Sequence, residues 1–190
     1  MNIGLYFGSF NPIHTGHLII ANQALNLTSL EKIWFIVSPQ NPLKEYDTLL
    51  PASKRLDLVK SAVSTDKRFS VSDVEFHLSK PSYTVNTLHY LGKKYSRHRF
   101  SIIMGSDSYS SLDKWKNFES IINEYHIFVY PRPDVKLRNK LMPSVKILDA
   151  PLLSISSTEI RELIKKRKSI RYLVPEKVRK EIEKNNYYKK

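Results

Sequence analysis

Short apolar runs recur along the chain and are separated by segments in which apolar residues return at helical spacing. The runs are rich in β-branched and aromatic residues, which suit strands buried on both faces of a sheet. We expect six such strands in one sheet, at Ile3–Phe7, Ile33–Val37, Phe69–Ser72, Phe100–Met104, His126–Tyr130 and Val145–Leu148.

Helices are expected between these strands. In the second of them Leu56, Val59 and Val63 repeat at helical spacing. The regular alternation of strand and helix predicts an α/β fold, a Rossmann-like, doubly wound and mainly parallel sheet with helices on both faces. The expected helices lie near His17–Asn26, Ala52–Ser64, Val85–Tyr95 and Phe118–Asn123.

The pattern changes after Leu148. Ser156-Ser157-Thr158-Glu159 reads as a capping box that begins a helix, and Pro175 suits the first turn of another. We expect a single domain over residues 1–190, with an α/β core at 1–150 and a small C-terminal helical appendage at 151–190. Residues 185–190 are expected to be frayed.

Composition supports one compact core, because 41% of the 190 residues are hydrophobic and 26% are charged. The longest apolar run, Ile33–Val37, is far shorter than the roughly 20 residues that span a bilayer. No basic segment precedes the first apolar residues, and the chain has no cysteine. We therefore expect a cytoplasmic protein with no membrane partner.

The net charge of +13 favours polyanionic partners such as nucleotides, nucleic acid or anionic lipid. Between residues 161 and 190, twelve Lys and Arg residues stand against four Glu residues, a local charge of +8. Such a cluster is typical of a solvated helical face, and a basic nucleic-acid-binding module is the alternative that the charge leaves open.

The residues that follow the first strand suggest an anion site. Ligands bind beyond the carboxyl ends of strands in open α/β sheets, and Gly8 and Gly16 let backbone amides approach a phosphate. His14 and His17, three residues apart at a helix entrance, can both donate to one phosphoryl group; from the spacing alone, a capping and a packing role are the alternative. A zinc site would need a further ligand that no motif supplies, and neither a P-loop nor a G-x-G-x-x-G pattern is present.

The stretch Gly8-Ser9-Phe10-Asn11-Pro12-Ile13-His14-Thr15-Gly16-His17 resembles the T/H-x-G-H signature of the nucleotidyltransferase superfamily. Further motifs, in the same order, make the chain similar to bacterial nicotinate-nucleotide adenylyltransferases from about Asn2 to about Ile182. These motifs are Asn41–Lys44, Ser82–Thr84 with Thr87-Leu88, Gly105–Ser108, Trp115-Lys116 and Ile155–Arg161.

The resemblance implies an enzyme of NAD biosynthesis that transfers AMP from ATP to nicotinate mononucleotide, giving deamido-NAD and pyrophosphate. The displacement would be direct and in line, which suits residues that position substrate and stabilise charge. Mg²⁺ would arrive with ATP, without a dedicated metal site on the protein.

The resemblance also assigns residues to roles. The catalytic set would be His14, His17, Lys44 and Arg161. Nicotinate mononucleotide would contact Ser9, Phe10, Lys44, Tyr83, Thr84 and Trp115, with the indole stacked on the pyridine ring. ATP would contact Gly8, Ser9, Phe10, His14, His17, Gly105, Asp107, Ile155, Ser156, Ser157 and Arg161.

Several alternatives remain open from the residues themselves. Asp107 suits a helix N-cap and Trp115 a core position equally well. Related enzymes that act on nicotinamide mononucleotide or pantetheine phosphate share the first motif, and the sequence leaves the oligomeric state, including a homo-oligomer, undecided. Two departures from the family pattern are Leu43 in place of a frequent His and Asn11 in place of a frequent Asp.

Overall fold

The computed structural model describes residues 1–39, 49–133, 135 and 142–189. Its centre is a six-stranded sheet with the strand order β3-β2-β1-β4-β5-β6. Every pairing in the sheet is parallel, and Leu5 of β1 lies opposite Trp34 of β2 and Ile102 of β4. The strands are β1 (Asn2–Gly8), β2 (Lys32–Val37), β3 (Phe69–Ser72), β4 (Arg99–Gly105), β5 (His126–Tyr130) and β6 (Val145–Ile147).

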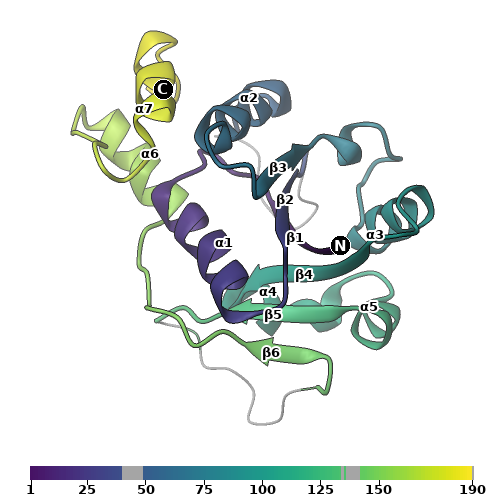
Figure 1. The fold of residues 1–190 in the computed structure, drawn as a ribbon. Coiled ribbons are helices and arrows are strands. Elements are labelled where there is room, and N and C mark those ends of the chain that lie inside the picture. The colour runs from purple at the N-terminus through teal and green to yellow at the C-terminus, as the bar shows by residue number, and fades with distance from the viewer. Residues whose placement is uncertain (40–48, 134, 136–141, 190) are drawn as a thin grey trace.

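Side chains alternate between the two faces of the sheet, and each face has its own hydrophobic cluster. Tyr6 and Ile103 belong to the cluster under α1 and α2, whereas Leu5 and Ile102 belong to the cluster under α3 and α5. Figure 1 shows these two pairs of helices on opposite sides of the sheet. The helices of the core are α1 (Thr15–Leu27), α2 (Ala52–Val63), α3 (Thr84–Lys94), α4 (Ser106–Ser110) and α5 (Phe118–Glu124).

The C-terminal helices α6 (Ser157–Lys165) and α7 (Glu176–Lys184) pack onto the face that α1 and α2 cover. Val178 and Ile182 of α7 are buried there, and α7 contacts α2. In Figure 1 the yellow C-terminal end therefore lies beside α2, far along the chain but close in space. The appendage is continuous with the main core.

The sequence predicted these strands and long helices to within two residues at each end. It missed the short helical segments η1 (Val74–Phe76), α4 and η2 (Leu112–Lys114), which are too short for a periodic pattern to develop. The helix predicted to begin after Pro175 is α7, which has Pro175 as its N-cap. None of the helices in the described parts of the chain combines the length and apolar character needed to cross a bilayer.

The prediction of a frayed C-terminus is wrong for residues 185–188. The Tyr187 N–H donates to the Ile182 carbonyl at 3.0 Å, and the rings of Tyr187 and Tyr188 pack against the hydrophobic cluster under α2. Aromatic burial outweighs the entropy that normally frees a chain end.

Candidate active site

A cavity of about 400 Å³ opens at the carboxyl ends of β1 and β4. The strand order reverses direction between these two strands, so the loops that follow them leave toward opposite faces and a crevice remains between them. Leu49 and Thr158 complete its wall along with parts of β1, β4, α4 and α6. The described lining residues include Gly8, Ser9, Phe10, Asn11, His14, His17, Gly105, Asp107, Trp115, Arg132, Ser156, Ser157 and Arg161.

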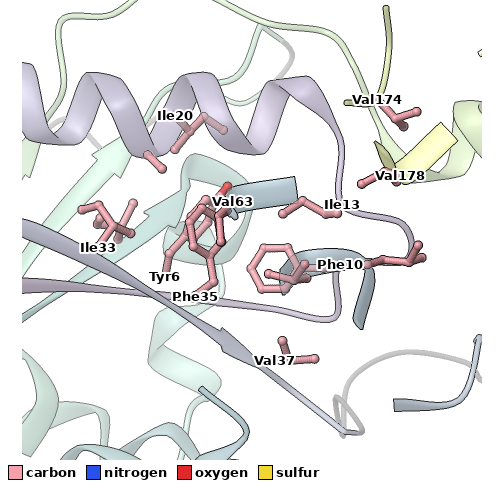
Figure 2. Packing of buried hydrophobic residues seen from close by; sticks show 14 of the residues in the cluster. Tyr6, Phe10, Ile13, Ile20, Ile33, Phe35, Val37, Val63, Val174 and Val178 are labelled. Atoms are coloured by element: carbon pink, nitrogen blue, oxygen red, sulfur yellow. The ribbon is translucent and has the colours of Figure 1, made fainter. Parts of the chain in front are cut away.

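The loop after β1 is shaped around one inward-facing ring. Phe10 has a positive φ of 46°, which is uncommon for a bulky residue. Its ring folds back over Gly8, where a Cβ would lie 2.8 Å from the Phe10 ring. Figure 2 shows Phe10 turned into the cluster beside Tyr6 and Phe35. Gly8 thus makes room for the buried ring, a role the sequence alone did not show.

His14 and His17 lie together at the N-terminus of α1. The two rings are stacked with centroids 3.7 Å apart. The His14 backbone N–H donates to Nδ1 of His17 at 3.2 Å, so in the neutral imidazole of His17 the proton lies on Nε2. Nε2–H is then a hydrogen-bond donor at the cavity that His17 lines.

His14 is the N-cap of α1 and is only 2% exposed. Burial, together with the positive charge of Arg132, lowers its pKa to about 3, so the ring is neutral at physiological pH. None of the described residues hydrogen-bonds to its buried Nδ1. Gly16 leaves room for this ring, since a Cβ there would lie 3.0 Å from Nδ1. The structure therefore gives His14 a capping position and a buried ring nitrogen that no described residue hydrogen-bonds.

The start of α6 forms the opposite wall. The Ser156 side chain accepts a hydrogen bond from the Glu159 N–H at 3.1 Å, which confirms the predicted N-cap. Ser157 donates to the Pro12 carbonyl at 2.9 Å, and Arg161 donates to the Asn11 carbonyl at 2.8 Å. These bonds hold the N-terminus of α6 directly against the loop that follows β1.

Arg132 is a cavity residue that sequence reasoning missed. Its backbone N–H donates to Ser106 Oγ at 2.9 Å, and its Nε lies 3.7 Å from Asp107 Oδ1. This Nε is buried and has no hydrogen-bond partner among the described residues. Arg132 lies two residues after Tyr130, the last residue of β5, and a cation just beyond a parallel strand is a signal that could have identified it.

The cavity brings together most of the residues singled out from the sequence, but not all of them. Tyr83, Thr84 and Ile155 are not part of its described lining, and Lys44 lies outside the described residues. Tyr83 instead packs on the same hydrophobic cluster as Trp115, and the Lys116 ammonium lies 4.6 Å from the centroid of its ring.

This arrangement is suited to binding phosphates. The N-termini of two helices, α1 and α6, face one cavity, and each turns the positive end of its dipole toward it. Two guanidinium groups, Arg132 and Arg161, add positive charge. Asp107 is the one carboxylate among the described lining residues.

Comparison with known proteins identifies the class. A model of the cytidylyltransferase-like family matches residues 5–163. The solved nicotinic acid mononucleotide adenylyltransferase of Plasmodium falciparum, complexed with NaAD, superposes with a TM-score of 0.85 at 23% identity, over 98% of this chain and 97% of that one. The chain therefore belongs to the cytidylyltransferase-like family and shares the fold of that structure.

Curated relatives narrow this class. A protein of Cytophaga hutchinsonii named "Probable nicotinate-nucleotide adenylyltransferase" is 49% identical and is aligned over 99% of this chain and 98% of its own. A protein of Flavobacterium johnsoniae with the same name is 48% identical over the full length of both chains. Within its class, the chain belongs to the nicotinate-nucleotide adenylyltransferase family.

Proposed function

We propose that this protein transfers AMP from ATP to nicotinate mononucleotide, producing deamido-NAD and pyrophosphate. The observation that supports this most directly is the convergence of two helix N-termini, two histidines and two arginines on one cavity at the switch point of the sheet. Such a site can hold a polyphosphate and stabilise the charge that moves during transfer. The names of the full-length relatives supply the acceptor.

The reaction requires positioning more than acid–base chemistry. An oxygen of the acceptor phosphate attacks the α-phosphorus of ATP, and the bond from that phosphorus to the bridging oxygen breaks. The electron pair leaves with pyrophosphate. A phosphate monoester loses its second proton with a pKa of about 6, so the attacking oxygen is already ionised near neutral pH. No general base is needed.

The two histidines would act as hydrogen-bond donors to the α- and β-phosphates. His17 can offer Nε2–H to the cavity, and none of the described residues hydrogen-bonds to Nδ1 of the buried His14 ring. Ser156, Ser157 and Arg161 would hold the β- and γ-phosphates at the N-terminus of α6. As pyrophosphate leaves, these groups stabilise the negative charge that it accumulates.

The acceptor would bind on the side of Trp115 and Asp107. Trp115 lines the cavity and can stack on a pyridine ring. Tyr83 packs on the same cluster under α3 and α5 as Trp115, and Thr84 is the first residue of α3. Backbone N–H groups at this helix start can donate hydrogen bonds to the nicotinate carboxylate. Lys44 would add a positive charge to the phosphates.

We expect Mg²⁺ to enter with ATP, coordinated by phosphate oxygens and water. In the described part of the chain no three His, Asp or Glu side chains cluster as a metal site would require. The ion would neutralise phosphate charge during transfer. We also place the reaction in the cytoplasm, which agrees with a chain that has no cysteine.

An acceptor panel tests the proposal. Pyrophosphate release is measured with ATP and Mg²⁺ in the presence of nicotinate mononucleotide, nicotinamide mononucleotide or pantetheine phosphate. Release with the nicotinate acceptor, together with deamido-NAD detected by mass, is the expected result. Release with another acceptor alone would mean that the protein uses a different acceptor. The assignment of Tyr83, Thr84 and Trp115 to the nicotinate would then be wrong. No release from a folded protein would overturn the proposed reaction.

A further inference from the structure

Arg55 is a buried cation that the reaction as described does not use. It belongs to α2, its relative exposure is 0%, and it forms an ion pair with none of the described carboxylates. Burial lowers its pKa to about 10, so the guanidinium stays charged at neutral pH. Burying a charge without a counter-ion is costly, and an apolar side chain would fill the same space at lower cost. The charge therefore needs an explanation other than packing.

The guanidinium donates four hydrogen bonds to backbone carbonyls of described residues. Nε donates to the Leu50 carbonyl at 2.8 Å and Nη2 to the Pro39 carbonyl at 2.8 Å. Nη1 donates to the carbonyls of Ser38 at 2.8 Å and Ser9 at 2.5 Å. One side chain thus ties the entrance of α2 to the ends of the loops that leave β1 and β2.

The bond to Ser9 has a direct consequence at the cavity. In a trans peptide the carbonyl and the following N–H point in opposite directions. Fixing the Ser9 carbonyl toward Arg55 therefore directs the Phe10 N–H away from Arg55. Ser9 and Phe10 both line the cavity, and none of the described residues accepts a hydrogen bond from the Phe10 N–H.

The same hydrogen bond helps to hold Phe10 in an unfavourable backbone conformation. Phe10 holds a φ of 46°, a conformation that is unfavourable in a residue other than glycine and persists only where surrounding contacts enforce it. The Phe10 ring supplies one such contact by packing on Tyr6 and Phe35. The hydrogen bond from Arg55 to the Ser9 carbonyl supplies the other.

We propose that Arg55 is a positioning residue for the nucleotide site: by holding the Ser9 carbonyl it turns the Ser9–Phe10 peptide so that the Phe10 N–H is presented to a phosphate oxygen in the cavity. The inference rests on the proposed function for the identity of the phosphate. Arg55 itself does not touch substrate, since its guanidinium is engaged by carbonyls on the far side of that peptide.

The first test replaces the planar guanidinium with a compact ammonium group. Arg55→Lys keeps the charge but cannot reach all four carbonyls, so the Ser9–Phe10 peptide is released. The KM of at least one nucleotide substrate should rise about tenfold, more than kcat falls. Arg68→Lys is the matched control, because Arg68 is exposed and pairs with Asp66. A folded Arg55→Lys variant with the kinetics of Arg68→Lys would overturn the proposal.

The second test reads the Phe10 amide itself. The chain has eight phenylalanines, so ¹⁵N-phenylalanine labelling gives a simple amide spectrum in which Phe10→Leu assigns the Phe10 peak. Adding pyrophosphate, ATP or nicotinate mononucleotide, each separately, should shift that peak downfield in the wild-type protein and much less in Arg55→Lys. These titrations need no turnover, so they stand even if AMP transfer fails.

The titration of the wild-type protein tests the inference even if the variant is unstable. If Arg55→Lys does not fold, a Phe10 amide that responds to none of the three ligands in the wild type still overturns the inference. If Arg55 had a purely structural role, Arg55→Lys would have a lower melting temperature, but its KM values and the ligand-induced shift of its Phe10 amide peak would equal those of the wild type. That result would also contradict the proposal.

Discussion

At the residue scale, two neighbouring histidines have different electrostatic environments. His14 is buried and lies in the field of Arg132, whereas His17 is half-buried and accepts a hydrogen bond from the backbone at Nδ1. In the proposed reaction both would donate hydrogen bonds to a phosphate rather than act as acid–base catalysts. Neither the burial of His14 nor the hydrogen bond accepted by His17 can be predicted from the H-x-G-H spacing, because both depend on the residues around the rings.

His17→Ala removes the donor that faces the cavity and leaves the helix in place. We expect kcat/KM for AMP transfer to fall at least about 100-fold, because a donor that stabilises developing charge contributes about that much. Steady-state kinetics with circular dichroism measure both effects. His77→Ala is the matched control, since the His77 side chain is 73% exposed and pairs only with nearby Asp73 among the described residues. Wild-type turnover in His17→Ala would contradict the assigned role.

The buried neutral His14 predicts a pH dependence of stability. In the unfolded chain its pKa is about 6.5, whereas in the fold it is about 3. Only the unfolded state binds the proton between these values, so the free energy of unfolding should fall as pH drops from about 6.5 to about 3. The slope from this group is at most about 1.4 kcal/mol per pH unit.

Urea unfolding at several pH values compares the wild type with His14→Asn. The variant lacks this titration, so its stability should depend less steeply on pH in that window. Parallel curves for the two proteins would show that His14 titrates normally in the fold.

At the scale of elements, the two helices that face the cavity begin with different caps. α1 is capped by a buried histidine, and α6 by Ser156, whose side chain accepts from Glu159 N–H. The N-cap predicted at Ser156 was therefore correct as a structural interpretation. Its place in the cavity wall makes the functional interpretation compatible with it, because a helix N-terminus can cap itself and still present other amides to an anion.

Ser156→Asp separates these two roles. The carboxylate can still accept the Glu159 N–H, so the unfolding free energy should stay within about 0.5 kcal/mol of the wild type. A negative charge beside the phosphates should nevertheless raise the KM for ATP about tenfold or more. Ser156→Ala should instead lose about 1 kcal/mol of stability. Chemical denaturation and kinetics on both variants measure this, and an unchanged KM in Ser156→Asp would exclude α6 from the phosphate site.

At the scale of the whole molecule, the end of the chain completes the core. The Tyr188 hydroxyl is buried without a hydrogen-bond partner among the described residues, and the charges of Arg55 and Arg161 act on it. The last turn of the chain thus lies close to the arginine that holds the first loop and to the arginine of α6. Segments almost the full length of the sequence apart meet there.

Deleting residues 187–190 should destabilise the protein by about 2 kcal/mol, because it exposes apolar surface under α2 and α7. Deleting only 189–190 leaves both tyrosines and should be neutral. Tyr188→Phe should leave stability unchanged or slightly raised, since it removes a buried hydroxyl that has no partner in the described structure. Thermal and urea unfolding compare the three, and equal stability of the two truncations would show that the tail does not contribute to the core.

The sequence by itself determined the alternation of strands and helices, the capping of α6 and the candidate residues His14, His17, Asp107, Trp115 and Arg161. These follow from local periodicity, cap chemistry and motif order, which are properties of neighbouring residues. Only the tertiary structure decided the neutral state of His14, the places of Arg132 and Arg55 beside the first loop, and the packing of Tyr188. Burial and contacts between segments far apart in the chain determine these three features. Contacts between such distant segments leave no periodic pattern in the sequence.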